Sequence, residues 1–570
     1  MTKFPESIIN LVQICHYKGI ENIVLSPGSR CAPLTLSFVR HPEIKTYTIT
    51  DERSAGYFAL GLAQQTGKPV GLVCTSGTAT LNYAPAITEA FYQNIPLIVF
   101  TADRPPEWID QYDNQSIHQT NIYAPHCQGS FLLPIDNNSH DSRWHSNRII
   151  SEAINKAVFP TPGPVHINVP LREPLYPDNE SFDFSQPVKV IFQSPINPTL
   201  PESEWEYLID IWNKSKRKVI LSGLNNPDMD LNETLARLIK DKNDRVIISD
   251  ITGNLDVVEK IYFSDAVAGS EDESIQTELA PDLLITFGGQ IVSKYIKMLL
   301  RKYPPTEHWH IQSGGIVGDT YQALTRIIPV KADYFFSEVN QRENFRLQKN
   351  TYTALWHKKN NQVKAAIETF LTQEKSFNEF SVMYYLIKHL PESSKLQLGN
   401  SMPIRYANFI SLYRKNGIKV NSNRGTSGID GTLSTTVGAS QTTSEITTLI
   451  TGDLAFFYDR NGLWNRYINP NLRIIILNNH GGGIFRILEG SSRQPELNEY
   501  FETINSHNAE LTAKEAGIEY QRINNYEQLE KSLKSFFIKD QKAKLMEIET
   551  DSKTNTLFFS EFKKMVKNLK

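Results

Sequence analysis

Two polar clusters in the last quarter of the chain have the residue types and spacing to hold a hard cation together with a phosphate. One apolar run ends in Gly452-Asp453 and a second ends in Asn478-Asn479, with Asn479 lying 26 positions after Asp453. A carboxylate and an amide oxygen at the ends of neighbouring strands are ligands that Mg²⁺ prefers when it also holds a phosphate. The adjacent glycines let backbone N–H groups approach a diphosphate closely. Either half alone is typical of a turn or a polar loop, but the two together predict a cation and diphosphate site.

A second acidic residue, Glu52, lies near the start of the chain in the run ITDERSAGYFALGLA. It follows an expected strand and opens an expected apolar helix, which places it for partial burial. Partial burial raises the pKa of a carboxyl group and allows it to share a proton with a nitrogen base. The alternative is a first-turn glutamate that is favoured by the helix dipole. Next to the Asp453 and Asn479 pair, we favour the catalytic interpretation.

Four arginines occur in separate polar or glycine-rich turns of a chain whose net charge is −3. They are Arg30 in SPGSR, Arg104 in TADRPP, Arg405 four residues after Ser401, and Arg424 in SNRGTSGIDG. A planar guanidinium binds a carboxylate through two parallel hydrogen bonds. A single arginine is usually solvated or paired at the surface, whereas four in such turns predict a substrate with several carboxylates. If the segment is helical, Ser401 and Arg405 face the same side and can clamp one carboxylate.

The elements that position these residues follow an alternating pattern of short β-rich runs and longer helical runs. This alternation predicts parallel sheets with crossover helices, an α/β fold whose ligands bind at the carboxyl ends of the strands. A stretch rich in Pro, Ser and Asn between Asp178 and Glu202 indicates a linker. The first and third strand series look alike. We predict three domains of parallel sheet flanked by helices, at residues 1–185, 200–340 and 350–570.

Length and composition exclude several classes of protein. At about 150 residues per domain, 570 residues correspond to three or four domains. The near-neutral charge argues against a nucleic-acid partner. The four cysteines, Cys15, Cys31, Cys74 and Cys127, show no C-x-x-C spacing, which argues against zinc and disulfides and favours a reducing, cytoplasmic location. No apolar stretch approaches the roughly 18 residues of a membrane span, so no membrane insertion is expected.

The same motifs resemble a known enzyme class. The Gly-Asp to Asn-Asn pair is similar to the diphosphate motif of thiamine diphosphate enzymes, with GDL here in place of the common GDG. SPGSR, TADRPP, Asn114-Gln115, Gly399-Asn-Ser401 and SNRGTSGIDG, in this order, resemble the 2-succinyl-5-enolpyruvyl-6-hydroxy-3-cyclohexene-1-carboxylate synthase (MenD) family of menaquinone biosynthesis. The match covers both outer domains nearly end to end. It implies a pyrimidine-binding, a central and a diphosphate-binding domain.

The resemblance implies a role for each matching residue. Glu52 hydrogen-bonds N1′ of the cofactor's aminopyrimidine ring and thereby promotes removal of the C2 proton. The cation, Mg²⁺ or Mn²⁺, is held by Asp453, Asn479 and the main-chain carbonyl of Gly481. Further implied cofactor-binding residues are Gly452, Leu454, Ile429, Ile484 and Phe485, of which Ile429 supports the bent cofactor. The implied substrate-binding residues are Ser29, Arg30, Arg104, Asn114, Gln115, Lys294, Ser401, Arg405 and Arg424.

The implied activity is that of a thiamine diphosphate-dependent transferase. It decarboxylates 2-oxoglutarate and adds the resulting carbanion to isochorismate, with release of CO₂. The implied assembly is a homodimer or homotetramer with active sites between subunits. One departure concerns the central domain, where the family commonly carries a Lys-Arg pair and this chain has Lys294-Tyr295. Lys294 keeps one cation, but Tyr295 does not replace a guanidinium.

Three alternatives remain open from the sequence. The first is another thiamine diphosphate enzyme, such as an acetolactate synthase or a 2-oxo acid decarboxylase, which would share the cofactor motif but not the arginine-bearing turns. The second is a dinucleotide-dependent α/β enzyme, although no G-x-G-x-x-G follows a strand. The third is a noncatalytic scaffold that retains the fold; the joint presence of Glu52, Asp453 and Asn479 argues against it.

Overall fold

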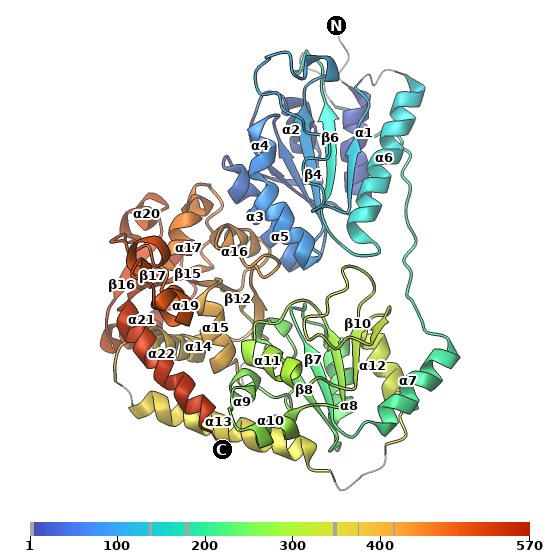
Figure 1. Ribbon diagram of the computed structural model, residues 1–570. Coiled ribbons are helices and arrows are strands. Elements are labelled where there is room, and N and C mark those ends of the chain that lie inside the picture. Colours follow the sequence, from blue (N-terminus) through green and yellow to red (C-terminus); the bar gives the residue numbers. More distant parts are fainter. Residues whose placement is uncertain are drawn as a thin grey trace.

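Three parallel β-sheets flanked by helices form three lobes of the molecule (Figure 1). The computed structural model describes residues 5–135, 139–176, 182–345, 350–373, 375–413 and 417–569. The sheets comprise residues 22–170, 218–328 and 395–549. The predicted α/β class with three parallel sheets is confirmed. Each sheet lies within one of the three proposed domains, whose exact boundaries remain a prediction.

The first sheet has six strands, and its central strands are apolar on both faces because helices cover both sides. In spatial order the strands are β2 (Lys45–Thr48), β1 (Asn22–Leu25), β3 (Val70–Cys74), β4 (Leu97–Asp103), β6 (Val165–Pro170) and β5 (Gly129–Leu132). The helices are α1 (Glu6–Tyr17), α2 (Ala32–Arg40), α3 (Glu52–Thr66), α4 (Thr78–Asn82), α5 (Ala84–Gln93) and α6 (His140–Val158). The order reverses direction between β1 and β3, so their carboxyl ends flank a switch point of the kind where α/β folds bind ligands.

The third sheet repeats this connectivity. Its strands are β13 (Lys419–Asn421), β12 (Lys395–Leu398), β14 (Thr447–Gly452), β15 (Leu472–Asn478), β17 (Lys544–Glu549) and β16 (Glu519–Ile523). Its helices are α13 (Tyr352–Gln373), α14 (Glu379–His389), α15 (Met402–Ile410), α16 (Thr432–Ser440), α17 (Asp453–Tyr458), α18 (Ile484–Ile487), α19 (Glu489–Ser492), α20 (Glu510–Glu515), α21 (Tyr526–Phe536) and α22 (Ser552–Lys567). In both sheets the order by chain position is second, first, third, fourth, sixth, fifth, which explains why the two strand series look alike in sequence.

The central sheet has five strands. They are β11 (Arg326–Ile328), β10 (Glu307–Ile311), β9 (Leu283–Phe287), β7 (Lys218–Ser222) and β8 (Arg245–Ser249), and the helices are α7 (Glu202–Lys214), α8 (Met229–Ile239), α9 (Ser264–Ala268), α10 (Glu273–Leu279), α11 (Lys294–Lys302) and α12 (Ala332–Arg342). An extended segment without helix or strand, residues 182–201, connects it to the first lobe (Figure 1). The beginning of the predicted linker, residues 178–181, lies outside the described residues.

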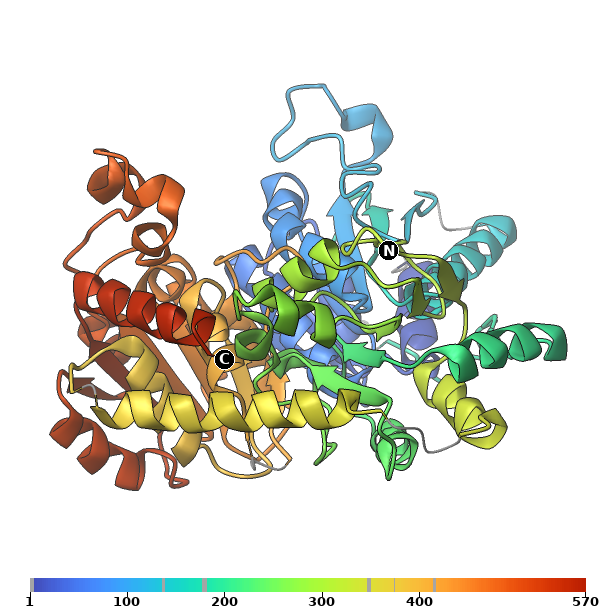
Figure 2. The ribbon, with the colours of Figure 1, turned by 60° about the horizontal axis from the view of Figure 1, so that its bottom comes forward.

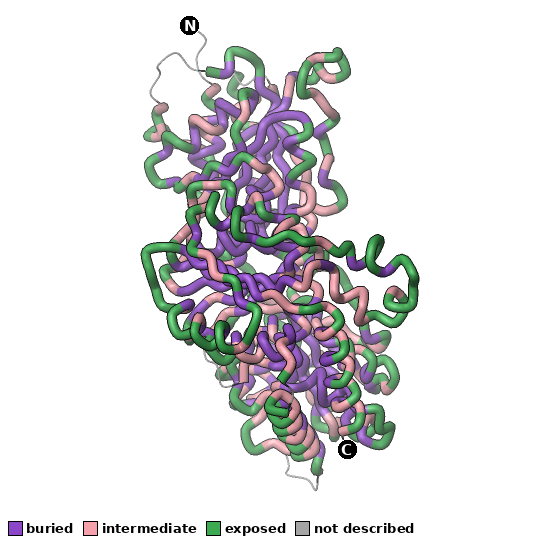
Figure 3. Tube along the Cα trace, turned by 90° about the vertical axis from the view of Figure 1, so that its left-hand side faces the viewer, coloured by how far each residue is buried: buried purple, intermediate pink, exposed green. Residues whose placement is uncertain are grey.

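The first and third lobes pack against each other through two helices that have glycine where they cross. Helix α3 of the first domain crosses α16 of the third, and a Cβ at Gly61 or at Gly438 would collide with the backbone of the opposite helix. The long helix α13 contacts α9 and α10 of the central lobe and α22 of the third, and Figure 2 shows it extending beneath both lobes. Figure 3 shows the buried trace continuing through the interior of all three lobes. None of the described helices combines the length and apolar character needed to span a bilayer.

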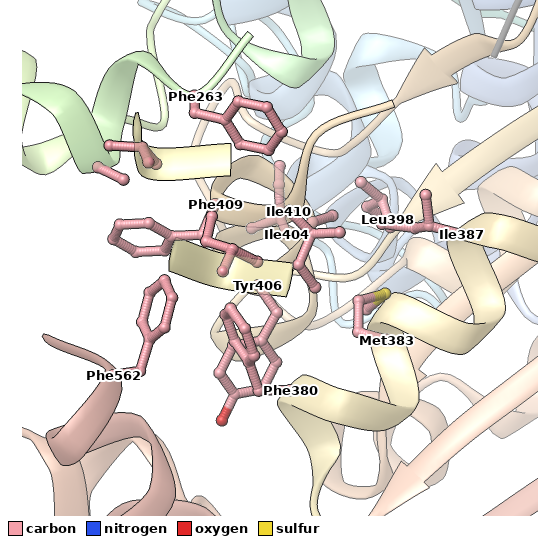
Figure 4. Packing of buried hydrophobic residues seen from close by; sticks show 14 of the residues in the cluster. Phe263, Phe380, Met383, Ile387, Leu398, Ile404, Tyr406, Phe409, Ile410 and Phe562 are labelled. Carbon is pink, nitrogen blue, oxygen red and sulfur yellow. The ribbon is translucent and has the colours of Figure 1, made fainter. Parts of the chain in front are cut away.

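An aromatic cluster fixes helix α15, which carries Arg405. Phe380 of α14 lies with its ring centroid 4.4 Å from that of Phe562 on α22 and 5.6 Å from that of Tyr406. Phe409 packs against Phe562 at 5.5 Å (Figure 4). Because the neighbouring residues of α15 are buried in this cluster, the helix has no freedom to rotate, and the direction of the Arg405 side chain is set by packing.

Candidate active site

The carboxyl ends of β14 and β15 bring Asp453 and Asn479 to the same edge of the third sheet. Gly452 at the end of β14 pairs with Leu477 of β15, so the residues that follow each strand are neighbours. Asp453 begins α17 and is only 1% exposed, and burial raises its pKa to about 7. The Asn505 amide donates to Asp453 Oδ2 at 3.4 Å. The geometry therefore groups the two side chains that the sequence singled out.

Asn479 presents an oxygen to this edge. Its Nδ2 donates to Glu379 Oε1 at 2.6 Å, whereas its Oδ1 is buried and has no hydrogen-bond partner among the described residues. Asn478 has a different role: its Nδ2 donates to Glu547 Oε1 at 2.7 Å, and its Oδ1 accepts from His480 N at 2.9 Å. The first asparagine thus holds the loop, and the second leaves a ligand atom free.

The loop from Gly481 to Phe485 completes the edge. A Cβ at Gly481 would lie 2.6 Å from the carbonyl oxygen of Glu502, and Gly482 N donates to that same oxygen at 2.7 Å. Only glycine therefore allows this close approach of the two backbones. Arg486, directly after this loop, forms an ion pair with the buried Glu502 carboxylate, and this ion pair holds the end of the loop. Ile484, at the start of α18, and Phe485 are partly exposed beside it.

These groups fit a cation that is shared with a diphosphate. Asp453 supplies one carboxylate, Asn479 Oδ1 lacks a partner, and Gly481 O accepts one hydrogen bond, from Gly483 N at 3.0 Å, which leaves a lone pair. All three are oxygen donors, the set that hard cations prefer. Within the described residues, no cluster of three His, Cys, Asp or Glu side chains could hold a metal. A cation at this edge would therefore need further ligands, such as phosphate oxygens.

Glu52 is the first residue of α3, the helix that follows β2 in the first domain. The Asp51 side chain caps the helix by accepting from Ser54 N at 3.2 Å. Glu52 is half-buried, and Asn82 Nδ2 lies 3.5 Å from its Oε2. In the described part of the chain, no hydrogen bond or ion pair joins Glu52 to Asp453.

Arg30 and Arg104 form one cationic group at the carboxyl edge of the first sheet. Arg30 is 7% exposed, donates to Leu171 O at 3.1 Å and pairs with Glu173 at 3.3 Å. Arg104 pairs with Asp113 at 2.5 Å. Burial lowers the pKa of Arg30 most, and the nearby positive charge of Arg104 lowers it further. Ser29, immediately before Arg30, is exposed beside this group.

Asn114 and Gln115 lie in a long loop after β4 that protrudes from the first lobe (Figure 2). The carbonyl oxygen of Asn114 accepts from Arg104 Nε at 2.8 Å, so the loop and the arginine hold each other. Gln115 has a positive φ of 53° and packs against Gly77. Sequence reasoning missed Gln119, a 1% exposed side chain that accepts from Gly77 N at 2.9 Å and anchors the base of the loop.

Arg405 and Arg424 form a second cationic group, on the third domain. Arg405 donates to the carbonyl oxygen of Ser401 one helical turn earlier, and Arg424 donates to Asn400 Oδ1 at 3.3 Å. Burial, followed by the Arg424 charge, lowers the pKa of Arg405. Arg424 Nε is buried without a hydrogen-bond partner. In the described part of the chain neither guanidinium forms an ion pair, so both remain available to an acid.

The loop that carries Arg424 is held by all three domains. Glu89 of the first domain, which is 0% exposed, accepts from Gly425 N at 2.6 Å and from Thr426 N at 2.7 Å. Gln290 of the central domain donates to Gly425 O at 2.9 Å. Further along this loop, Ile429 is 37% exposed, and Tyr57 donates to the Asp430 carboxylate at 2.8 Å. Leu454, next to Asp453, is partly exposed.

The central domain places a different lysine beside Arg424 than the sequence suggested. Lys294, the first residue of α11, is exposed and lies near Lys563 of α22. Lys297, one turn later, is half-buried; burial lowers its pKa, the Asp250 carboxylate opposes this effect, and the Arg424 charge lowers the pKa further. A second lysine three residues after the first was a signal that sequence reasoning did not use.

The switch point of the central sheet, between β7 and β9, is closed by its own loops. Gly289 N donates to Leu224 O at 2.8 Å, and Leu224 N donates to Gln290 O at 3.1 Å. A Cβ at Gly223 would collide with the carbonyl oxygen of Gly289. A dinucleotide would bind at this position in a doubly wound sheet, and the contact between the loops leaves no crevice for it. This disfavours the dinucleotide-dependent alternative.

Comparison with known proteins agrees with this geometry. Residues 10–122 match the family model described as "Thiamine pyrophosphate enzyme, N-terminal TPP binding domain". The chain is 41% identical to the 2-succinyl-5-enolpyruvyl-6-hydroxy-3-cyclohexene-1-carboxylate synthase of Cytophaga hutchinsonii, over 98% of this chain and 99% of that protein. The synthases of the same name from Flavobacterium johnsoniae and Porphyromonas gingivalis are 40% and 39% identical, over 97% and 95% of this chain and 97% and 93% of theirs. The chain therefore belongs to the 2-succinyl-5-enolpyruvyl-6-hydroxy-3-cyclohexene-1-carboxylate synthase family.

Proposed function

We propose that this protein decarboxylates 2-oxoglutarate and adds the remaining four-carbon unit to isochorismate, as a thiamine diphosphate-dependent transferase. The observation that carries the proposal is the identity of about 40% with synthases of this name over nearly the whole chain. The two arginine groups support it, since two acids with several carboxylates need cationic binding sites.

For the cofactor, we propose that Mg²⁺ or Mn²⁺ is held by Asp453, Asn479 Oδ1 and the Gly481 carbonyl, together with the diphosphate of thiamine diphosphate. Gly452 and the backbone around Leu454 lie against the diphosphate, and the apolar side chains Ile429, Ile484 and Phe485 line the remainder of the cofactor. When bound, thiamine diphosphate supplies the nucleophilic carbon and the electron sink for loss of CO₂. Glu52 holds a proton at N1′ of the aminopyrimidine ring.

For the substrates, we propose that the two arginine groups hold carboxylates of the two acids. Arg405 and Arg424, with Ser401 at the helix start, form the group on the third domain. Arg30 and Arg104, with Ser29, Asn114 and Gln115, form the group on the first domain. Lys297, near Arg424, and Lys294, near Lys563, add positive charge from the central domain.

A product assay tests the proposed function directly. With 2-oxoglutarate and isochorismate together, we expect CO₂ release and the six-membered-ring adduct that carries a succinyl group, detected by mass spectrometry. With pyruvate alone, we expect no acetolactate, and the purified protein should be colourless because no flavin is bound. Acetolactate formation from pyruvate, without an adduct from the two acids, would instead support the acetolactate synthase-like alternative. Cofactor binding with no turnover of any 2-oxo acid would support the scaffold alternative.

We propose that the active enzyme is a homodimer, or a homotetramer built from such dimers, with each active site formed by two chains. The resemblance to thiamine diphosphate enzymes supports this arrangement, since it implies that Glu52 of one chain contacts the aminopyrimidine while Asp453 and Asn479 of the other contact the diphosphate. Glu52→Gln and Asp453→Ala proteins are each expected to be inactive. After subunit exchange, hybrid dimers should recover part of the activity, because one of their two sites contains both wild-type residues.

The exchange itself is verified with differently tagged chains and native mass spectrometry. Mixing two preparations of the same variant is the control, and it should recover no activity. Hybrids that form in the expected ratio and remain inactive would contradict the proposal of shared sites.

A further inference from the structure

A buried glutamate outside every sequence motif, Glu379, lies directly behind Asn479. It is the first residue of α14, is 2% exposed, and its backbone N–H donates to Asn555 Oδ1 at 2.9 Å. Its Oε1 accepts from Asn479 Nδ2 at 2.6 Å. Tyr406 and Thr550 also form hydrogen bonds with the carboxylate. The carboxylate is therefore fixed on several sides and faces Asn479.

Helix α14 cannot shift away from this position without disrupting the core. The residue after Glu379 is Phe380, which packs in the aromatic cluster with Tyr406 and Phe562 (Figure 4). The Asn378 side chain caps the helix by accepting from Ser381 N at 2.9 Å. The start of the helix is thus held by the Asn378 cap and by the core packing of Phe380, and these contacts fix the position of Glu379.

The orientation of the Asn479 amide has a chemical consequence. An asparagine side chain presents an acceptor oxygen on one side and a donor NH₂ group on the other. Because the NH₂ group donates to Glu379, Oδ1 is directed away from that carboxylate, where it is buried without a partner. The reverse orientation would place Oδ1 against the Glu379 oxygens and turn NH₂ hydrogens toward the cation ligands.

We propose that Glu379 is a positioning residue that fixes the Asn479 amide with its oxygen toward the cation. This inference rests on the proposed function, in which Asn479 is a cation ligand. The hydrogen bond that connects Glu379 with the proposed cation ligands is the one from Asn479. Groups that orient a metal ligand from behind contribute roughly 10- to 100-fold to metal affinity.

The test measures cation binding rather than turnover. The full-length protein is stripped with a chelator, saturated with thiamine diphosphate, and titrated with Mg²⁺ by calorimetry and with Mn²⁺ by electron paramagnetic resonance. Glu379→Leu removes the acceptor and should raise the cation concentration at half-saturation by about 10- to 100-fold. Glu379→Gln keeps an acceptor oxygen and should lose less. Glu343→Gln, a 6% exposed carboxylate paired with Arg245 in the central domain, is the control; it should leave the cation titration unchanged.

A double-mutant cycle separates positioning from a general loss of structure. Asn479→Asp presents an oxygen on both sides, one of them against the Glu379 carboxylate, so in that background Glu379→Leu should cost no cation affinity and, by removing the facing carboxylate, should raise it. If Glu379→Leu fails to fold, the cycle is run with Glu379→Gln, which preserves the shape. Equal losses in both backgrounds would overturn the inference.

Asn479→Ala distinguishes failure of the inference from failure of the proposed function. If Asn479→Ala weakens cation binding and the folded Glu379 variants bind Mg²⁺ like the wild type, the positioning role is wrong and the ligand assignment stands. If neither change affects cation binding, the assignment of Asn479 as a ligand is wrong, and the inference falls with it.

Discussion

Replacement of Glu52 by glutamine is expected to lower kcat by about 10²- to 10⁴-fold while thiamine diphosphate still binds. Glutamine has nearly the same shape, so the start of α3 and its Asp51 cap remain intact. It cannot hold an exchangeable acidic proton at N1′ of the aminopyrimidine, and the proton transfer that activates the cofactor is lost. Turnover is measured with both acids at saturation, and cofactor affinity is measured by calorimetry on the same protein.

The matched control is Glu43→Gln, which changes an exposed glutamate of the same domain that is paired with His16. It should leave both kcat and cofactor affinity unchanged. A second readout is exchange of the C2 proton of bound thiamine diphosphate into deuterated water, which the Glu52 variant should slow even without substrate. Turnover and proton exchange at the wild-type rate in Glu52→Gln would refute the assigned role.

Replacement of Arg405 or Arg424 by alanine is expected to lower kcat/KM for one or both acids by roughly 30-fold to several thousand-fold. This range follows from the cost of about 2–5 kcal/mol for losing one partner of a desolvated charge pair. Both arginines are half-buried, burial lowers the pKa of each, and neither forms an ion pair in the described part of the chain. The carboxylate of a bound acid would supply the missing partner. Each variant is titrated separately with 2-oxoglutarate, isochorismate and thiamine diphosphate.

The same substitution at Arg30 and at Arg104 should also reduce kcat/KM for the acids. These two arginines already have partners, Glu173 and Asp113, so their loss also leaves a carboxylate unpaired. Replacement of each of the four arginines by lysine should restore only part of the lost kcat/KM. An ammonium group keeps the positive charge but lacks the planar guanidinium that binds a carboxylate through two hydrogen bonds. Thiamine diphosphate affinity should be nearly intact throughout.

The control for the arginine variants is Arg326→Ala, which removes a half-exposed arginine paired with Glu204 in the central domain. It should change neither acid affinity nor turnover. If all four site variants bound both acids like the wild type, the arginines would be structural, and the synthase proposal would lose its support from charge.

The sequence by itself determined the features that depend on neighbouring residues. Asp453 and Asn479 could be placed at strand ends because apolar runs end in glycine or asparagine, and chain direction in a parallel sheet sends both ends to one edge. The helix that begins at Glu52 was predicted from its apolar run, whereas a helix after Ser401 was only the condition under which Ser401 and Arg405 would face the same side. The repeated strand order of the outer sheets was visible only as a likeness between two strand series.

Only the tertiary structure decided which distant residues support the site. Glu379 lies 100 positions before Asn479, and Glu89 lies 336 positions before Gly425. In sequence, each is an acidic residue in a helix, indistinguishable from a solvated one. Lys297 rather than Lys294 lies beside Arg424 because the rotation of α11 is set by packing of Ile296 and Leu299 in the core. Whether a side chain is buried, and which residue it pairs with, depend on how helices pack against sheets. Local residue patterns do not encode that packing.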